Sequence, residues 1–178
     1  VFTYEHDLWS VPARGGQALR LTSYPGTENF AKFSPDGKWL AFTGSYDGPI
    51  AVYVMPAEGG DPVRLTYTPG GALAVGWTPD GKRVVFRSMH ENVVGRDPNL
   101  YFVDREGSAP ERFPLDRGVL CSFSPDGKKI LYNRRGNEEY YWKRYKGGQY
   151  TDILLYDFGT KRFTPITEYF GKNAYPMW

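Results

Sequence analysis

The chain has 178 residues, enough for one ordinary domain with a substantial buried core. Lys and Arg number 22 and Asp and Glu number 20, so the formal net charge of +2 argues against a chain built mainly to hold nucleic acid or an anionic membrane. Aromatic residues make up 17%, and 21 Gly and 14 Pro accompany them. This composition predicts short strands joined by tight turns and excludes a helical protein.

The expected strands follow one another along the chain in similar groups. The first group lies at 1–3, 8–11 and 19–22. The second has a strand ending at Phe33 and further strands at 39–42, 51–54 and 63–66. The third has a strand ending at Trp77 and further strands at 83–86, 100–103 and 112–114. The fourth has a strand ending at Phe123 and further strands at 129–132, 153–156 and 163–166.

A Ser/Thr-Pro-Asp-Gly-Lys motif marks the same point in three of these groups. It begins at Ser34, Thr78 and Ser124, so its copies are 44 and 46 residues apart. Pro fits the second position of a type I turn, Asp tolerates the third, and Gly supplies the following residue with positive φ. Such a turn joins two antiparallel strands and adds one bulge residue. Each copy therefore predicts a β-hairpin.

Four short strands in every ~40–45 residues are typical of a β-propeller blade, and a generic β-sandwich does not repeat at a fixed period. We therefore expect an all-β fold, a β-propeller of four-stranded antiparallel blades. About four blades are present, either as an arc of a larger six-bladed ring or as a closed four-bladed ring. The whole chain, 1–178, is expected to be one propeller segment. Its expected parts are a partial blade at 1–28, blades at 29–68, 72–115 and 118–167, and the first strand of a next or closing blade at 174–178.

Both ends of the chain fall inside the repeat, so both termini are expected to be truncated. For that reason the localisation is left unknown, with a slight preference for the cytoplasm and with a signal peptide still possible. No apolar run reaches the roughly 18–20 residues that span a bilayer, so no membrane partner is expected. The single cysteine, Cys121, excludes an intramolecular disulfide framework and a multi-cysteine zinc site.

The loop between the second and third strands of the last blade differs from its counterparts. It runs over 134–151, which is 18 residues, against 6 at 44–49 and 10 at 89–98. Loops of this length are uncommon unless they are functional or disordered. Basic and aromatic residues alternate within it, and from Arg134 to Gly148 its net charge is +3. The candidate binding residues are Trp142, Lys143, Arg144, Tyr145 and Lys146.

Three interpretations of this loop stay open. The favoured one has the aromatic residues folding the loop back over the sheet or against a neighbouring domain. In the second, the loop binds an anionic group, such as a peptide carboxylate, near the opening of the ring. In the third, it stacks on single-stranded nucleic acid, but no wider basic surface supports this, so no nucleic acid partner is expected.

No catalytic residue is predicted in this chain. A Ser-His-acid set needs a histidine, and the chain has only His6 and His90, neither near a glycine-flanked serine of the nucleophile-elbow type. Cys121 is interpreted as a buried filler of a strand. The recurring Asp36, Asp80 and Asp126 are turn residues, not paired acids, and neither a metal site nor a cofactor is expected.

The repeats resemble those of the TolB translocation proteins and of several peptidase families. Phe33 to Lys38, Trp77 to Lys82 and the unit-closing Gly59 to Thr66 carry this resemblance. The segment Trp142-Lys-Arg-Tyr-Lys-Gly-Gly148, followed by a strand with Tyr156-Asp157, resembles the amino-terminal propeller of tricorn-type proteases. The Asp7-Leu8-Trp9 strand is similar to the same region.

The tricorn resemblance implies a non-catalytic propeller segment of a large serine peptidase, a hydrolase, that acts as a peptide channel, filter or docking module. Its implied partners are peptides or the rest of the protease. A homo-oligomer of the parent protein is a further possible assembly. Two alternatives stay open. One is a stand-alone TolB-like protein-interaction propeller, and the other is the propeller of a prolyl-oligopeptidase-type peptidase.

Overall fold

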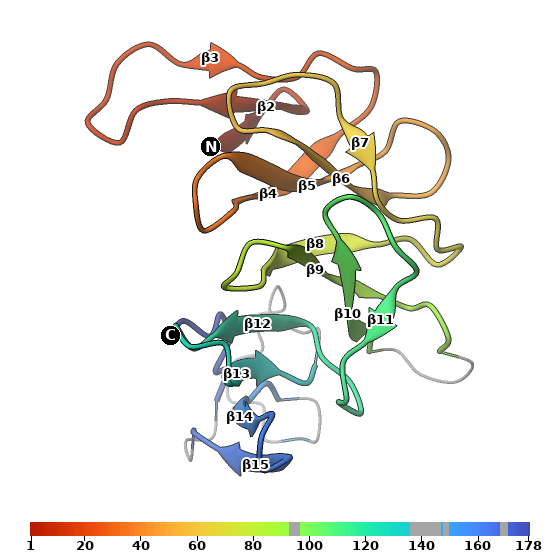
Figure 1. Cartoon of the computed structure of the whole chain (residues 1–178), viewed down its shortest axis with the longest axis vertical. Coiled ribbons are helices and arrows are strands. Elements are labelled where there is room, and N and C mark those ends of the chain that lie inside the picture. Colours follow the sequence, from red (N-terminus) through yellow and green to blue (C-terminus); the bar gives the residue numbers. More distant parts are fainter. Residues whose placement is uncertain (93–96, 136–146, 148–149, 168–170) are drawn as a thin grey trace.

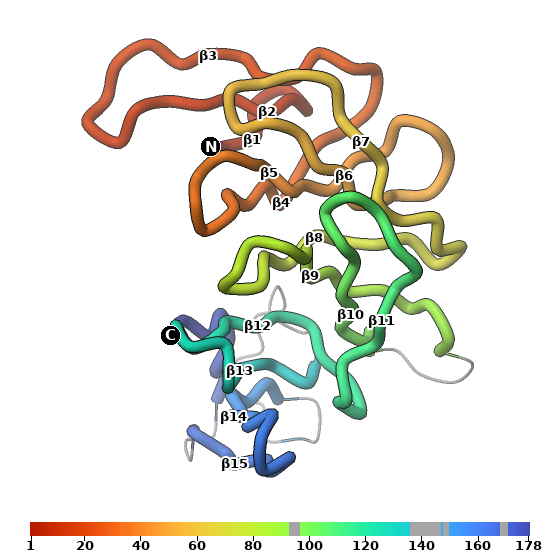
Figure 2. Tube along the Cα trace, in the orientation of Figure 1, coloured from red at the N-terminus to blue at the C-terminus, as the bar shows by residue number. Residues whose placement is uncertain are grey.

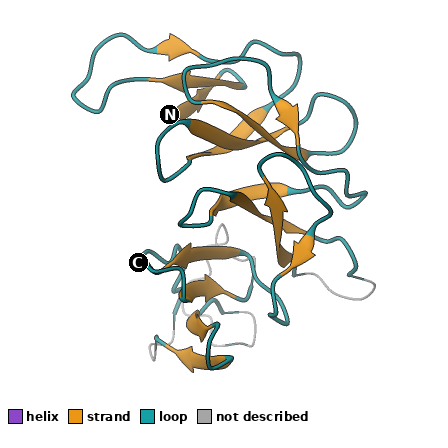
Figure 3. Ribbon diagram, in the orientation of Figure 1, coloured by secondary structure: helices purple, strands orange, loops and turns teal. Residues whose placement is uncertain are grey.

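The computed structural model describes residues 1–92, 97–135, 147, 150–167 and 171–178. Within these residues the chain forms fifteen strands and no helix, so the prediction of an all-β fold is confirmed (Figure 3). The strands form one three-stranded sheet and three four-stranded sheets, and every pairing is antiparallel. This is the propeller-like arrangement that the repeats predict.

Each sheet consists of strands that are consecutive in the sequence. The first contains β1 (Phe2–Tyr4), β2 (Asp7–Ser10) and β3 (Leu19–Arg20). The second contains β4 (Glu28–Phe33), β5 (Trp39–Gly44), β6 (Ala51–Pro56) and β7 (Val63–Arg64). The third contains β8 (Leu73–Trp77), β9 (Arg83–Ser88), β10 (Asn99–Asp104) and β11 (Glu111–Arg112). The fourth contains β12 (Leu120–Phe123), β13 (Lys129–Asn133), β14 (Ile153–Asp157) and β15 (Arg162–Pro165).

The repeated turn motif is held by hydrogen bonds of its own first residue. The hydroxyl of Ser34 donates to Oδ1 of Asp36 at 2.6 Å and accepts from the backbone N–H of Trp39 at 3.0 Å. The N–H of Gly37 donates to the carbonyl of Ser34 at 2.9 Å, and Gly37 has a φ of 71°. The same bonds recur in the motifs that begin at Thr78 and Ser124. The motif thus closes each hairpin through local contacts.

A recurring threonine joins the outermost strand to its neighbour. Thr22 accepts a hydrogen bond from the N–H of Leu8 at 2.8 Å, and Thr66 accepts one from the N–H of Val52 at 2.9 Å. Both threonines are buried. They satisfy backbone donors where the short outer strand ends, which explains why the sequence Arg-Leu-Thr recurs at 20–22 and 64–66.

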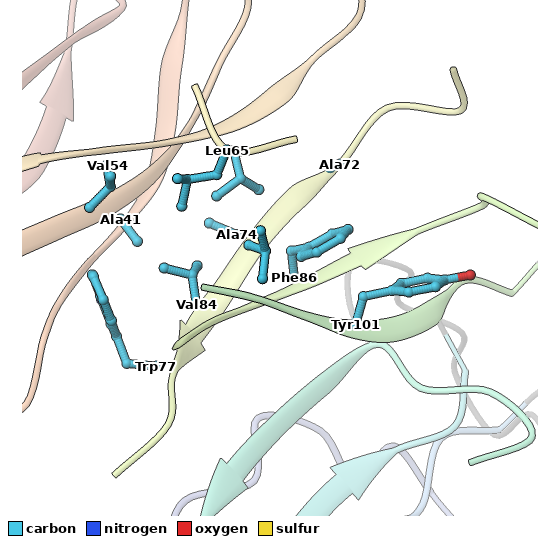
Figure 4. Close-up of a cluster of buried hydrophobic side chains, with 11 residues drawn as sticks. Ala41, Val54, Leu65, Ala72, Ala74, Trp77, Val84, Phe86 and Tyr101 are labelled. Carbon is cyan, nitrogen blue, oxygen red and sulfur yellow. The ribbon is translucent and has the colours of Figure 1, made fainter. Parts of the chain in front are cut away.

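The core lies between neighbouring sheets. One cluster joins the second and third sheets, where Ala41 and Val54 face Ala74, Val84 and Trp77 (Figure 4). A second cluster joins the third and fourth sheets, and a third joins the first and second. Each blade therefore buries its apolar face against the next blade, as repeat architectures require.

The four sheets follow one another as an open arc, with the first and the last at opposite ends of the molecule (Figures 1 and 2). The inner-edge strands converge, since β8 contacts both β4 and β12. Residues 174–178 form no strand here. They lie beside the fourth sheet, where the N–H of Trp178 donates to the Ser122 hydroxyl at 3.1 Å. That these residues begin a further or closing blade stays a prediction.

Candidate functional site

The five residues predicted to bind a ligand, Trp142, Lys143, Arg144, Tyr145 and Lys146, lie outside the described residues. Their role stays a prediction. The structure does describe both ends of the long loop that carries them. Arg134 and Arg135 follow β13 directly, and Tyr150 and Asp152 precede β14.

A cavity of about 280 Å³ lies at these loop ends. Its lining includes the guanidinium-bearing side chains of Arg117, Arg134 and Arg135, together with Tyr150 and Asp152. Arg117 comes from the connection between the third and fourth sheets, so two segments that are distant in sequence supply the positive charge. We call this site the arginine pocket. It lies at the end of the strands opposite the Ser-Pro-Asp-Gly-Lys turns, where β12 starts and β13 ends.

Two aspartates hold these guanidinium groups in place. Asp97 accepts from Arg117 at 3.1 Å and from Arg135 at 3.5 Å. Asp116 accepts from Arg134 and lies 3.7 Å from Nε of Arg117. The hydrogen bond to Asp116 raises the pKa of Arg134 above its ordinary value, so this group stays charged.

The arginine side chains are held but not enclosed. The side chains of Arg117, Arg134 and Arg135 are between 34% and 46% exposed. An arginine carries five N–H donors in a planar fork that fits a carboxylate. Guanidinium groups that are already held by aspartates and partly exposed can therefore donate to a further anion without being reoriented.

A second cavity, also about 280 Å³, lies along the inner edges of the sheets. It is mainly apolar, and its lining includes Phe30, Val75, Leu120, Tyr175 and Met177. Phe30 and Tyr175 both have positive φ, 56° and 57°, although neither is a glycine. Aromatic side chains at these two positions thus line the side of the arc toward which β4, β8 and β12 converge.

Among the contacts of the described residues, neither histidine side chain pairs with a serine or cysteine. The backbone N–H of His90 donates to the Ser88 hydroxyl and its carbonyl accepts from the hydroxyl of Tyr101, while His6 is exposed. Burial raises the pKa of the Cys121 thiol to about 12, which opposes a thiolate nucleophile. Over the described residues, no three His, Cys, Asp or Glu side chains come together as a possible metal site. The same part of the chain also contains no helix that could span a membrane.

Fold and site together define a segment of a β-propeller. The whole chain, 1–178, matches the family described as the tricorn protease N-terminal beta propeller domain, and the chain belongs to this family. The resemblance inferred from the sequence is thus confirmed.

Individual relatives agree with this membership. The chain is 30% identical to tricorn protease homolog 1 of Streptomyces coelicolor, over 99% of its own length and 17% of the relative. It is similar in structure to a tricorn protease, with a TM-score of 0.75, 23% identity, and 94% and 17% of the two chains covered. It is also similar to TolB of Acinetobacter baumannii, with a TM-score of 0.69, 27% identity, and 90% and 37% covered. The chain thus spans only a small part of the tricorn relatives.

Sequence reasoning found the loop but missed the arginine pocket at its ends. It included Arg134 and Arg135 in the loop charge and did not single them out, and it overlooked Arg117. The available signal was the pair of adjacent arginines directly after a strand, facing Asp116-Arg117 shortly before the neighbouring strand. Antiparallel pairing of β12 and β13 brings these two positions together.

Proposed function

We propose that this chain is a non-catalytic propeller segment of a tricorn-like serine peptidase and that it guides peptides by binding their carboxylate groups in the arginine pocket. The parent protease and its peptides are the implied partners. Membership of the tricorn amino-terminal propeller family supports the first part of this proposal. The arginine pocket supports the second.

The observation that carries the proposal is the grouping of Arg117, Arg134 and Arg135 around one cavity. The cavity is large enough for a carboxylate with part of a peptide, and Leu154 and Pro165 give it an apolar side. Asp97 and Asp116 fix the guanidinium groups before a ligand arrives, which lowers the entropic cost of binding. In the sequence, the same loop also carries Lys143, Arg144 and Lys146, which lie outside the described residues.

The test compares short peptides that differ only at the carboxyl terminus. We expect the chain to bind a peptide with a free terminal carboxylate and to bind its amidated form more weakly. Replacing Arg134 and Arg135 with Gln should weaken binding of the free peptide by about tenfold or more, since a hydrogen bond to a charged group contributes roughly 1.5–3 kcal/mol. Titration calorimetry measures both affinities.

Arg14 provides the matched control, because it is exposed in the turn between β2 and β3, away from the pocket. Arg14→Gln should leave both affinities unchanged. Equal binding of the free and amidated peptides, or equal effects of the pocket and control variants, would contradict the proposal. The chain alone should hydrolyse neither peptide.

A further inference from the structure

A larger cavity, of about 650 Å³, opens between the third and fourth sheets at the opposite end of the strands from the arginine pocket. Its walls are two successive turn motifs, which begin at Thr78 and Ser124. The aromatic rings of Phe102, Phe123 and Phe158 line its interior. We call it the interblade groove.

The corresponding space between the second and third sheets is filled. The register of the repeats equates Arg83 of the interblade groove with Trp39, and Phe123 with Trp77. Trp77 is only 8% exposed and packs among the buried residues of both sheets (Figure 4). Trp39 packs against the same cluster. Two tryptophans thus occupy the earlier position, and an arginine with a smaller phenylalanine leaves the later one open.

A second exchange changes the chemistry of the groove. The guanidinium of Arg105 lies over the ring of Trp39, 4.7 Å from its centre. Phe158 occupies the repeat position of Arg105. The N–H of Arg105 donates to the carbonyl of Lys82, the last residue of its turn motif, and the N–H of Phe158 donates to the carbonyl of the matching Lys128. The interblade groove therefore has an aromatic ring where the filled space has its cation.

The charge in the groove is predominantly negative. Asp80, Asp126 and Glu111 line it, against the single cation Arg83. Arg83 is already paired, because its Nη1 donates to Glu111 at 3.0 Å. Hydrogen bonds from the Thr78 hydroxyl and the Lys82 backbone lower the pKa of Asp80, and the matching bonds lower that of Asp126, so both are ionised at neutral pH.

Arg83 also shows how the groove accommodates a cation. Its guanidinium lies 4.1 Å from the centre of the Phe102 ring, a favourable cation–π distance. Phe123 and Phe158 form a second aromatic surface, with rings stacked at 6.3 Å and 8°. Among the cation–π contacts of the described residues, none involves the ring of Phe123 or Phe158.

We propose that the interblade groove binds a basic peptide segment that inserts an Arg side chain. The stem of that side chain lies on Phe123 and Phe158, and its head pairs with Asp80 and Asp126. Pro79, Pro114 and Pro125 supply apolar walls without N–H donors. The groove differs from the arginine pocket in position and in charge, so it selects the opposite kind of ligand.

The test uses the full chain and two peptides of five residues, capped at both ends, with Arg or citrulline at the central position and glycine elsewhere. Capping removes the terminal carboxylate, so the arginine pocket does not contribute. We expect the Arg peptide to bind at least about tenfold more tightly than the citrulline peptide, because citrulline keeps the shape and loses the charge. Added salt should reduce this difference.

Two variants and one control locate the binding. Asp80→Asn with Asp126→Asn keeps Oδ1 as the acceptor within each turn and should reduce the affinity for the Arg peptide about tenfold. Asp36→Asn makes the same change in the turn beside the filled space and should have no effect. Arg83→Trp with Phe123→Trp copies the filled space into the groove and should abolish binding.

The result that overturns the proposal is defined in the same assay. Equal affinity for the Arg and citrulline peptides, absence of binding, or an equal effect of Asp36→Asn and the double asparagine variant would each contradict it. If the double tryptophan variant fails to fold, as judged by circular dichroism, the asparagine variants still decide. Failure here leaves the carboxylate test unaffected.

Discussion

The indole N–H of Trp77 donates a hydrogen bond to the carbonyl oxygen of Lys32 at 2.9 Å, across 45 positions of sequence. This separation is close to one repeat, because Lys32 lies on β4 and Trp77 on β8, the inner-edge strands of neighbouring blades. The same side chain packs between the two sheets. One residue thus joins the blades both by burial and by a polar contact.

Trp77→Phe is therefore expected to destabilise the chain. The variant loses the hydrogen bond to Lys32 and leaves space between the sheets, which should reduce the free energy of unfolding by about 1–3 kcal/mol. Urea denaturation measures the change. Trp9→Phe is the matched control, because the indole of Trp9 donates to the carbonyl of Tyr4 at an exposed site. The control should lose less than about 1 kcal/mol, and equal losses would contradict this role of Trp77.

Ser34→Ala is expected to weaken the first complete turn motif. Its hydroxyl donates to Asp36 and accepts from Trp39, and the residue is only 4% exposed, so the variant leaves two polar groups without this partner. We expect a loss of about 1–3 kcal/mol in the free energy of unfolding. Ser108→Ala should lose less, because its hydroxyl, which accepts from the Asp104 N–H and donates to the Ala109 carbonyl, makes both bonds at an exposed site. A loss at Ser34 no greater than that at Ser108 would show that the turn does not depend on its hydroxyl.

The turns and strands could be predicted from the sequence because their contacts are local. The bonds of Ser34 reach only to Trp39, and the strand expected at 39–42 is β5, Trp39–Gly44. Short-range side-chain and backbone bonds leave a fixed spacing in the sequence, and the repeat of that spacing reveals the blades.

The two cavities could not be predicted in the same way. The arginine pocket depends on Asp97 reaching both Arg117 and Arg135, and Asp97 lies on a different blade from Arg135. The interblade groove depends on which residues of the fourth sheet lie opposite Arg83 of the third sheet. For this groove, the usable signal was a comparison of equivalent repeat positions, where tryptophan is replaced by arginine or phenylalanine.

Cys121 is expected to be chemically quiet in the folded chain. The residue is half-buried and lines the apolar cavity along the inner edges of the sheets. Desolvation there raises the pKa of its thiol to about 12, so the reactive thiolate is scarce at neutral pH. A thiol-specific disulfide reagent should therefore react slowly with the native protein and rapidly after unfolding in urea. Cys121→Ser removes the signal and serves as the blank. Rapid reaction of the native protein at neutral pH would contradict this prediction.

Glu28 is expected to make stability depend on pH. This side chain is fully buried, and burial raises the pKa of its carboxyl, although Thr22 donates a hydrogen bond to Oε2 at 3.0 Å. The folded chain thus binds this proton more tightly than the unfolded chain. The contribution of Glu28 to stability is greatest at low pH and decreases as pH rises from the ordinary carboxyl pKa to the raised one.

Glu28→Gln should remove this decrease, because the amide does not ionise and keeps an oxygen for Thr22. Carboxyls with a lowered pKa, such as those of Asp36 and Asp157, act in the opposite direction and in a more acidic range, where their contribution is lost as pH falls. The variant leaves these groups in place, so the difference between variant and parent isolates Glu28. Thermal unfolding across the acidic to neutral range measures it, with the exposed Glu58→Gln as control. A difference between Glu28→Gln and the parent that stays constant with pH would show that Glu28 does not titrate in this way.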